Sequence, residues 1–260
     1  MKVIIAFLFL VVSFVPNSRA SASDTDYDMF HLISYDNIDV YDFPVVPGTP
    51  EWNEMEEQDR RKAIQVPDSV LSTMSTLGLA WTCLKYPDRH FWNFSSDGAL
   101  PASIPSPEHK PLGFRWELLQ RPDAGSAILK VYQALDPALL DPDWPRIKKM
   151  YFEWDFALLE SMLSIPEILS GLSTEEKHRL LALCGDRYTT RLRQREGDVT
   201  IHLLMGRLFQ SVEDSPFFHD VNTSTDILEF LDYPTAMTQS TKRGMSTLSG
   251  FIEKFIRGND

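Results

Sequence analysis

Signals that start helices recur along the chain from residue 49 onward, and they constrain the fold more than any other feature. Thr49-Pro50-Glu51 combines an N-cap hydroxyl, a proline at the first helical position and an acid near the positive end of the helix dipole. Ser173-Thr174-Glu175-Glu176 is a capping box, in which the serine and the second glutamate satisfy each other's backbone donors. Further helix starts are predicted at Pro67-Asp68, Ser75-Thr76, Pro122-Asp123 and Trp144-Pro145.

Apolar residues follow these starts at the spacing of one helix face. The longest stripe predicts a central helix that begins at Pro145 and has Trp154 fully packed in the core. Its residues are Ile147, Tyr151, Trp154, Leu158 and Met162. The first helix is expected to reach about residue 65, and the last two to span 225–232 and 245–257. The sequence has no alternating strand pattern with Asn-Gly turns, so the predicted fold class is all-α, a multi-helix bundle or short α-solenoid-like array.

The N-terminus has the pattern of a cleavable signal peptide over residues 1–22. Lys2 precedes an apolar run that ends at Val15, which is too short for the roughly 20 residues of a membrane-spanning helix. Ala20-Ser21-Ala22 predicts cleavage before Ser23, with an uncleaved anchor as the alternative. The first cysteine is Cys83, so no lipid anchor is expected. The sequence therefore predicts an exported protein that is secreted or periplasmic.

Three segments follow the signal peptide. Residues 23–48 are rich in aspartate and aromatic residues, and we expect an extended N-terminal arm. Residues 49–260 are predicted to form a single helical domain. Within it, 95–112 contains four prolines and no periodicity, which indicates either a surface loop or a joint between two halves.

The chain is acidic, with a net charge of −12. Removal of the signal peptide takes away two cations, Lys2 and Arg19, and makes the net charge −14. Nucleic acids and anionic membrane surfaces are bound by clustered cations, so neither is an expected partner. No later segment of the sequence is long and apolar enough to span a membrane. A protein, peptide or glycan is the expected partner.

Two short patterns recur along the chain. Val66-Pro67-Asp68 and Met74-Ser75-Thr76 resemble Ile165-Pro166-Glu167 and Leu172-Ser173-Thr174. Leu84-Lys85-Tyr86-Pro87 resembles Leu231-Asp232-Tyr233-Pro234 in the same way. These pairs are either common helix-boundary sequences or the trace of a duplication, and a duplication would suggest stacked helical pairs.

Five segments carry a resemblance to a known family. They are Phe43 to Trp52, Val66-Pro67-Asp68, Met74-Ser75-Thr76, Cys83-Leu84-Lys85-Tyr86-Pro87, and Leu118 to Gly125. Over roughly residues 43–165 the chain resembles a family of uncharacterised exported proteins of Bacteroidales. Some members continue into an Asn-Cys-His-Ser-Tyr motif that suggests a cysteine hydrolase. This chain lacks that motif, so the resemblance implies export and transfers no activity.

No pattern of ligating or nucleophilic residues marks an active site. The six histidines include no pair at i, i+4, and the sequence has no Cys-x-x-Cys motif. Asp136, Asp141 and Asp143 lie close together but lack the glycine and final glutamate of a calcium loop. A Gly-x-Ser-x-Gly elbow and a glycine-rich phosphate loop are absent as well. The sequence therefore predicts no catalytic, cofactor-binding or metal-binding residues, and no cofactor.

Several weaker candidates leave alternatives open. Cys83 and His90 lie close in sequence, but Tyr86-Pro87 breaks the helix between them. The aromatic residues of 90–94 favour a core plug under the proline-rich loop over a stacking platform for a ligand. Cys83 and Cys184 could form a disulfide, although leucines beside each one favour buried free thiols.

Two functions remain after this search. The favoured one is a non-catalytic, exported helical protein that binds a partner, because a well-patterned scaffold comes without a catalytic cluster. The alternative is a hydrolase whose carboxylates are assembled from distant positions. Glu153 and Asp155 flank Trp154 on the central helix, but their i, i+2 spacing predicts that they face different sides.

Overall fold

The computed structural model describes residues 37–87, 113–192, 199–234 and 238–259, and these residues contain helices and no strand. The predicted all-α fold class is confirmed. The signal peptide, residues 23–36 of the predicted arm, the aromatic cluster at 90–94 and the segment 95–112 lie outside the described residues.

In chain order, the described helices are α1 (Pro50–Glu54), α2 (Glu57–Ala63), α3 (Asp68–Leu71), α4 (Thr76–Lys85), α5 (Gly113–Gln120), α6 (Ala124–Ala134), the 3₁₀ turn η4 (Pro137–Leu139), α7 (Arg146–Leu163), α8 (Pro166–Ser170), α9 (Thr174–Leu192), α10 (Val199–Ser211), α11 (Phe218–Thr223), α12 (Thr225–Asp232) and α13 (Gln239–Asn259). The four longest of these described helices, α7, α9, α10 and α13, belong to the second half of the chain.

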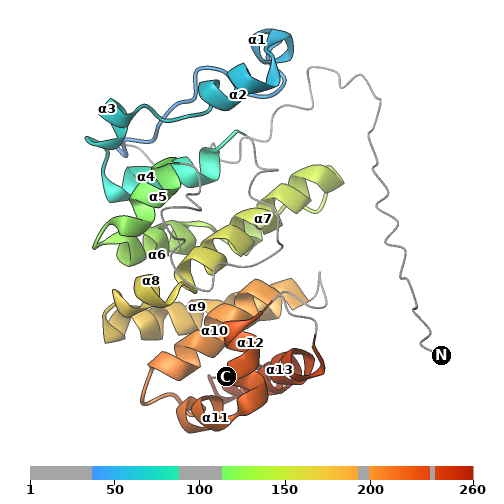
Figure 1. The fold of residues 1–260 in the computed structure, drawn as a ribbon. Coiled ribbons are helices and arrows are strands. Elements are labelled where there is room, and N and C mark those ends of the chain that lie inside the picture. The colour runs from blue at the N-terminus through green and yellow to red at the C-terminus, as the bar shows by residue number, and fades with distance from the viewer. Residues whose placement is uncertain (1–36, 88–112, 193–198, 235–237, 260) are drawn as a thin grey trace, which may run out of the picture.

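These helices are stacked in chain order (Figure 1). The helices α1–α3 lie at one end, α4–α6 follow, α7 crosses the middle, and α8–α13 complete the other end. Helix α4 packs on α6, α6 on α7, α7 on α10, and α10 on α12 and α13. Because each layer covers the apolar face of the next, the buried side chains form one continuous core that reaches from Phe43 to Ile252.

Three of the predicted helix starts, at Thr49, Ser75 and Ser173, are confirmed by side-chain caps. The Thr49 hydroxyl accepts a hydrogen bond from the Trp52 amide at 3.2 Å, and the Ser75 hydroxyl accepts one from the Gly78 amide at 2.9 Å. The capping box of α9 forms in both directions, as described below. The helix predicted from 49 to 65 is instead divided into α1 and α2, and α13 starts at residue 239 instead of 245.

The prediction for Trp154 is wrong. Trp154 is half-buried and packs edge-on against Tyr151, and Ile147 is 36% exposed. The buried side of α7 is the adjacent stripe, which contains Phe152, Asp155, Phe156, Leu159, Glu160 and Leu163. That stripe contains the carboxylates of Asp155 and Glu160. A prediction based on apolar periodicity assigns faces with carboxylates to solvent, so it selects the neighbouring face.

Both cysteines are free thiols in fully buried positions, as the sequence favours. Burial raises the pKa of Cys83 to about 12, although the charge of Arg115 acts in the opposite direction. A thiol that stays protonated is a poor nucleophile, so Cys83 behaves as a small apolar residue of the core.

Candidate functional site

Arginine side chains donate hydrogen bonds to main-chain carbonyls at the ends of several helices in this fold. The last carbonyls of a helix have no partner within that helix and need donors from elsewhere. Arg121, which follows α5, donates to the carbonyls of Leu71 and Met74, at 2.9 and 2.5 Å, and so satisfies the end of α3. It also forms an ion pair with Glu117 at 3.2 Å.

Arg187 of α9 satisfies the end of α6 in the same way, by donating to the carbonyls of Tyr132 and Leu135. Its guanidinium lies 3.7 Å from the centroid of the Tyr132 ring. The Tyr132 hydroxyl donates to Glu160 at 3.0 Å, and the Thr200 hydroxyl donates to the same carboxylate at 2.6 Å. Glu160 has no exposed surface, so this carboxylate of α7 joins three helices, α6, α7 and α10, and is closed to a ligand.

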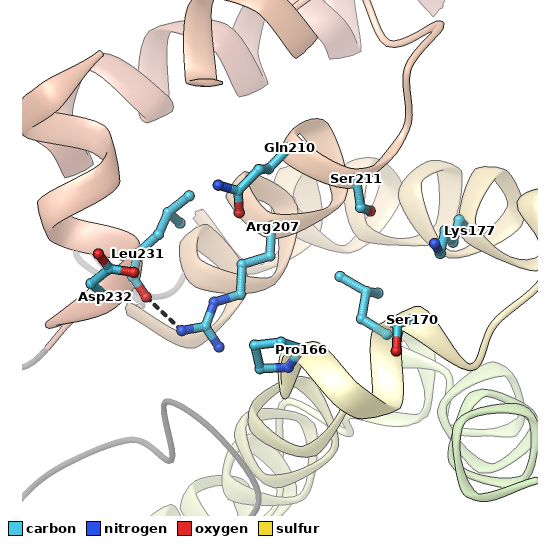
Figure 2. Close-up of a pocket in the computed structure, with 9 residues that line it drawn as sticks. Pro166, Ser170, Lys177, Arg207, Gln210, Ser211, Leu231 and Asp232 are labelled. Atoms are coloured by element: carbon cyan, nitrogen blue, oxygen red, sulfur yellow. Dashed lines mark hydrogen bonds between the residues drawn. The ribbon is translucent and has the colours of Figure 1, made fainter. Parts of the chain in front are cut away.

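Arg207 of α10 is the third of these arginines, and it borders a hollow (Figure 2). It donates to the carbonyl of Ser164 at 2.7 Å, just before α8, and to the carbonyl of Leu231 near the end of α12. The hollow, here called the Arg207 hollow, has a volume of about 240 Å³. Figure 2 shows Arg207 extending between Pro166 of α8 and Leu231 of α12.

The charge of Arg207 is only partly compensated. The side chain is 6% exposed and both of its hydrogen-bond partners are neutral carbonyls. Burial lowers the pKa of Arg207, and the more distant charges of Asp232 and Glu167 raise it. Within the described part of the chain, no carboxylate forms an ion pair with this guanidinium. A buried cation in this position would gain from an anion in the hollow.

Lys177 lies across the Arg207 hollow from Arg207, on the first turns of α9 (Figure 2). The hollow also contains the amide of Gln210 and the hydroxyl of Ser170, and its apolar lining comes from Pro166, Leu169 and Leu231. It is therefore a small site that offers two cations, several polar groups and an apolar wall.

A second and larger hollow of about 410 Å³ lies near the first. The two hollows have no lining residue in common, but consecutive residues line them. Lys177 and Ser211 line the first, and His178 and Val212 line the second. This second one, here called the Phe255 hollow, has an apolar lining of Leu181, Val212, Pro216, Phe255 and Ile256.

An imidazole and a carboxylate meet at the rim of the Phe255 hollow. His178 Nε2 lies 2.8 Å from Asp214 Oδ1, and the two side chains are 44% and 72% exposed. Such a pair can orient a histidine for proton transfer or hold the end of α10 against α9. Ser215, the neighbouring hydroxyl, accepts a hydrogen bond from the Phe217 amide at 3.3 Å, so it is engaged in the turn that follows α10.

A serine and a histidine also meet between α10 and α13. His202 Nε2 lies 2.9 Å from Ser249 Oγ and 3.2 Å from the hydroxyl of Tyr188. In a catalytic triad the orienting group binds the ring nitrogen opposite the nucleophile, whereas here both hydroxyls share one nitrogen. The Ser249 hydroxyl also donates to the Met245 carbonyl one turn earlier, so this cluster joins helices.

The aspartates considered for a calcium loop serve local turns. Asp136 accepts from the Ala138 amide and Asp141 from the Asp143 amide, each at 2.8 Å. The described residues contain no group of three or more histidine, cysteine, aspartate or glutamate side chains placed to hold a metal ion. Glu153 and Asp155 face different sides of α7, as predicted, since only Asp155 is buried. His90 lies outside the described residues.

The Arg207 hollow was not predicted from the sequence, although the sequence contains one signal of it. Arg207 interrupts the apolar run of α10 from Leu203 to Phe209, whose other members are all buried. An arginine at the centre of a buried helix needs internal acceptors or an anionic partner.

Comparison with family models, with curated proteins and with solved structures gave no match for this chain. Among the described residues, no helix combines the length and the apolarity needed to cross a membrane.

Proposed function

We propose that this protein is exported and acts as a non-catalytic binding protein, with a polypeptide segment as its ligand. The observation that carries the proposal is the proximity of the Arg207 and Phe255 hollows on the surface formed by α8–α13, where the consecutive residues Lys177 and His178 line one hollow each. One hollow is cationic and polar and the other is apolar. A peptide presents charged, amide and apolar groups in close succession, so it matches both hollows at once.

The contacts of the buried ionisable groups support binding as the activity. Glu160 and Arg187 are enclosed between helices. Glu160 accepts hydrogen bonds from the hydroxyls of Tyr132 and Thr200. Arg187 donates to the carbonyls of Tyr132 and Leu135. His202 and Ser249 join α10 to α13. These groups therefore fix the shape of the scaffold around the two hollows.

The expected signal peptide over residues 1–22 supports export. The chain should be expressed with its own first 22 residues in a bacterial host, and the exported product analysed by mass spectrometry. We expect a mature N-terminus at Ser23. Recovery of the full-length mass in the membrane fraction would contradict export by a cleaved signal.

Binding is tested with the purified chain on an array of immobilised 12-residue peptides of varied sequence. Gly185 lines the Phe255 hollow, and a Cβ built there lies 3.5 Å from Phe255 Cε1, an ordinary contact. Gly185→Ala should therefore fit and, as a glycine replaced inside a helix, should stabilise the fold by up to about 1 kcal/mol. Gly185→Leu should fill the hollow.

We expect the parent chain and Gly185→Ala to bind the same peptides and Gly185→Leu to lose them. A Gly185→Leu variant that melts like the parent and binds the same peptides equally well would refute the Phe255 hollow as the binding surface. If the parent chain retains no peptide, the proposal of a peptide-binding protein fails.

The alternative function, a hydrolase, is favoured by one observation, the exposed pair of His178 and Asp214 at the rim of the Phe255 hollow. Mass spectrometry of peptides incubated with the chain distinguishes the two functions. Cleavage that His178→Ala abolishes would support the hydrolase, and intact peptides that still bind to His178→Ala support the binding protein.

A further inference from the structure

We infer that the Arg207 hollow recognises a carboxylate attached to an apolar side chain, and that the C-terminal residue of a peptide supplies it. This inference rests on the proposed function, since it assigns the end of the peptide that enters one of the two hollows. It specifies a ligand chemistry for a site that the sequence did not predict.

The first observation is the state of Arg207. A guanidinium has five N–H donors, and the carbonyls of Ser164 and Leu231 account for two hydrogen bonds. The remaining donors belong to a buried cation beside an open volume. A carboxylate is the anion whose two oxygens match a planar guanidinium, and its charge would offset the burial of the cation.

The second observation is the arrangement of the other charges. Lys177 adds a second positive group on the opposite side of the hollow. The carboxylate of Asp232 is exposed at the edge near Leu231 and would repel a ligand with two neighbouring negative charges. This arrangement favours a ligand with a single carboxylate.

The third observation is the apolar wall and the size of the hollow. Pro166, Leu169 and Leu231 line it, and its volume of about 240 Å³ equals that of roughly eight water molecules in the liquid. That volume accommodates a carboxylate together with one apolar side chain of medium size. The amide of Gln210 lies in the same lining and can bond the preceding peptide group.

The proximity of the Phe255 hollow favours a peptide over a free amino acid. Ser211 lines the Arg207 hollow, and the next residue in the chain, Val212, lines the Phe255 hollow. A chain that leaves the Arg207 hollow in this direction would bury an earlier side chain against Phe255. A free amino acid would use the first hollow alone.

The test is a calorimetric titration of the full chain with three probes: the pentapeptide acetyl-Ala-Ala-Phe-Ala-Leu as the free acid, the same peptide with a C-terminal amide, and free leucine. We expect the free acid to bind at least about tenfold more tightly than the amide, because only the acid provides a charged acceptor. Equal affinities for acid and amide would overturn carboxylate recognition. Free leucine that binds as tightly as the peptide acid would overturn the peptide as its source.

Variants separate this inference from the proposed function. Lys177→Gln should weaken the binding of the free acid about threefold to tenfold and leave the affinity for the amide unchanged. Lys130→Gln, at an exposed position of α6 outside both hollows, is the matched control and should change neither the affinity for the acid nor that for the amide. If acid and amide bind equally and both are lost in Gly185→Leu, the inference fails while the binding function stands. If neither peptide binds although the array retains others, the leucine-terminated ligand is refuted.

Discussion

Two joints between helices are built in similar ways, and the difference between them locates the candidate site. The N-terminal joint connects α3 to α4, and the C-terminal joint surrounds α8 and leads into α9. In both, a serine caps the following helix, and an arginine from elsewhere in the chain donates to main-chain carbonyls. The arginine of the N-terminal joint, Arg121, has a carboxylate partner in Glu117, whereas Arg207 of the C-terminal joint borders a hollow.

The serine caps differ in the origin of the carboxylate that completes them. The Ser75 amide donates to Asp39 at 2.5 Å, from a segment 36 residues earlier. The Ser173 amide donates to Glu176 at 2.9 Å, within the same turn. Gly78 is required beside the first cap, because a Cβ there would lie 2.3 Å from Asp39 Oδ1.

The two joints are built alike but differ in whether the chain supplies a carboxylate to the arginine. Where the chain supplies its own carboxylate to the arginine, the joint is complete. Where it supplies only carbonyls, the arginine keeps both a structural role and the capacity to bind an anion. Both roles can be tested by changing one joint to resemble the other.

The largest effect is expected from Arg121→Met and Arg207→Met. Each variant leaves two helix-end carbonyls without their charged donor, and each should lower the free energy of unfolding by about 3 kcal/mol. Denaturation by urea measures both. Arg257→Met, from an exposed pair on α13, is the control and should stay within about 0.5 kcal/mol of the parent. A loss near 3 kcal/mol for Arg121→Met and near zero for Arg207→Met would show that only the N-terminal joint depends on its arginine.

A smaller loss is expected from the caps. Ser75→Ala and Ser173→Ala each remove the acceptor for the first free amides of a helix, and each should cost about 1 kcal/mol. The double variant should show additive losses, because the two caps belong to helices in different layers and share no partner. Strong non-additivity in urea denaturation would mean that the joints are coupled.

The features that could be predicted from sequence depend on residues close together in the chain. The cap of Ser173 joins residues three apart, so a local pattern reveals it. The acceptors of Arg207 lie 43 and 24 residues away, and the carboxylate for Ser75 lies 36 residues away. No local pattern encodes these distances, so the Arg207 hollow appears only in the folded chain.

The prediction of which face of α7 is buried was wrong for a related reason. Glu160 is tolerated in the core because Tyr132 and Thr200 donate to it, and Thr200 lies 40 residues further along the chain. A periodicity rule treats each carboxylate as exposed because it takes no account of such partners. The helix itself was predicted, and only its orientation was wrong.

Lowering the pH should weaken both caps. The pKa of Asp39 is lowered, because hydrogen bonds from Ser75 outweigh the opposing effect of burial, and hydrogen bonds from Ser126 and Ser173 lower the pKa of Glu176. A carboxyl whose pKa is lower in the folded than in the unfolded state stabilises the fold above its unfolded pKa of about 4. That stability is lost as the pH falls through the folded value.

Unfolding measured from pH 6 down to pH 2 should therefore show a loss below about pH 4 that becomes smaller in Asp39→Asn and in Glu176→Gln. If the two variants reduce the loss by similar amounts, the distant and the local carboxylate are equivalent. A pH dependence unchanged in both variants would contradict the lowered pKa values.

The smallest change in stability tests the difference between the joints most directly. Glu117→Gln removes the carboxylate from Arg121 and makes the N-terminal joint resemble the C-terminal one. Because the Glu117 side chain is 45% exposed, the cost should stay below about 1 kcal/mol and shrink in high salt. The reciprocal variant is Gln210→Glu, which places a carboxylate three residues after Arg207 on the same helix. It should stabilise the fold by a few tenths of a kcal/mol and abolish the preference for a peptide acid over its amide, because the new carboxylate occupies the guanidinium. If the Gln210→Glu variant still prefers the peptide acid over the amide, Arg207 is not the group that binds the carboxylate.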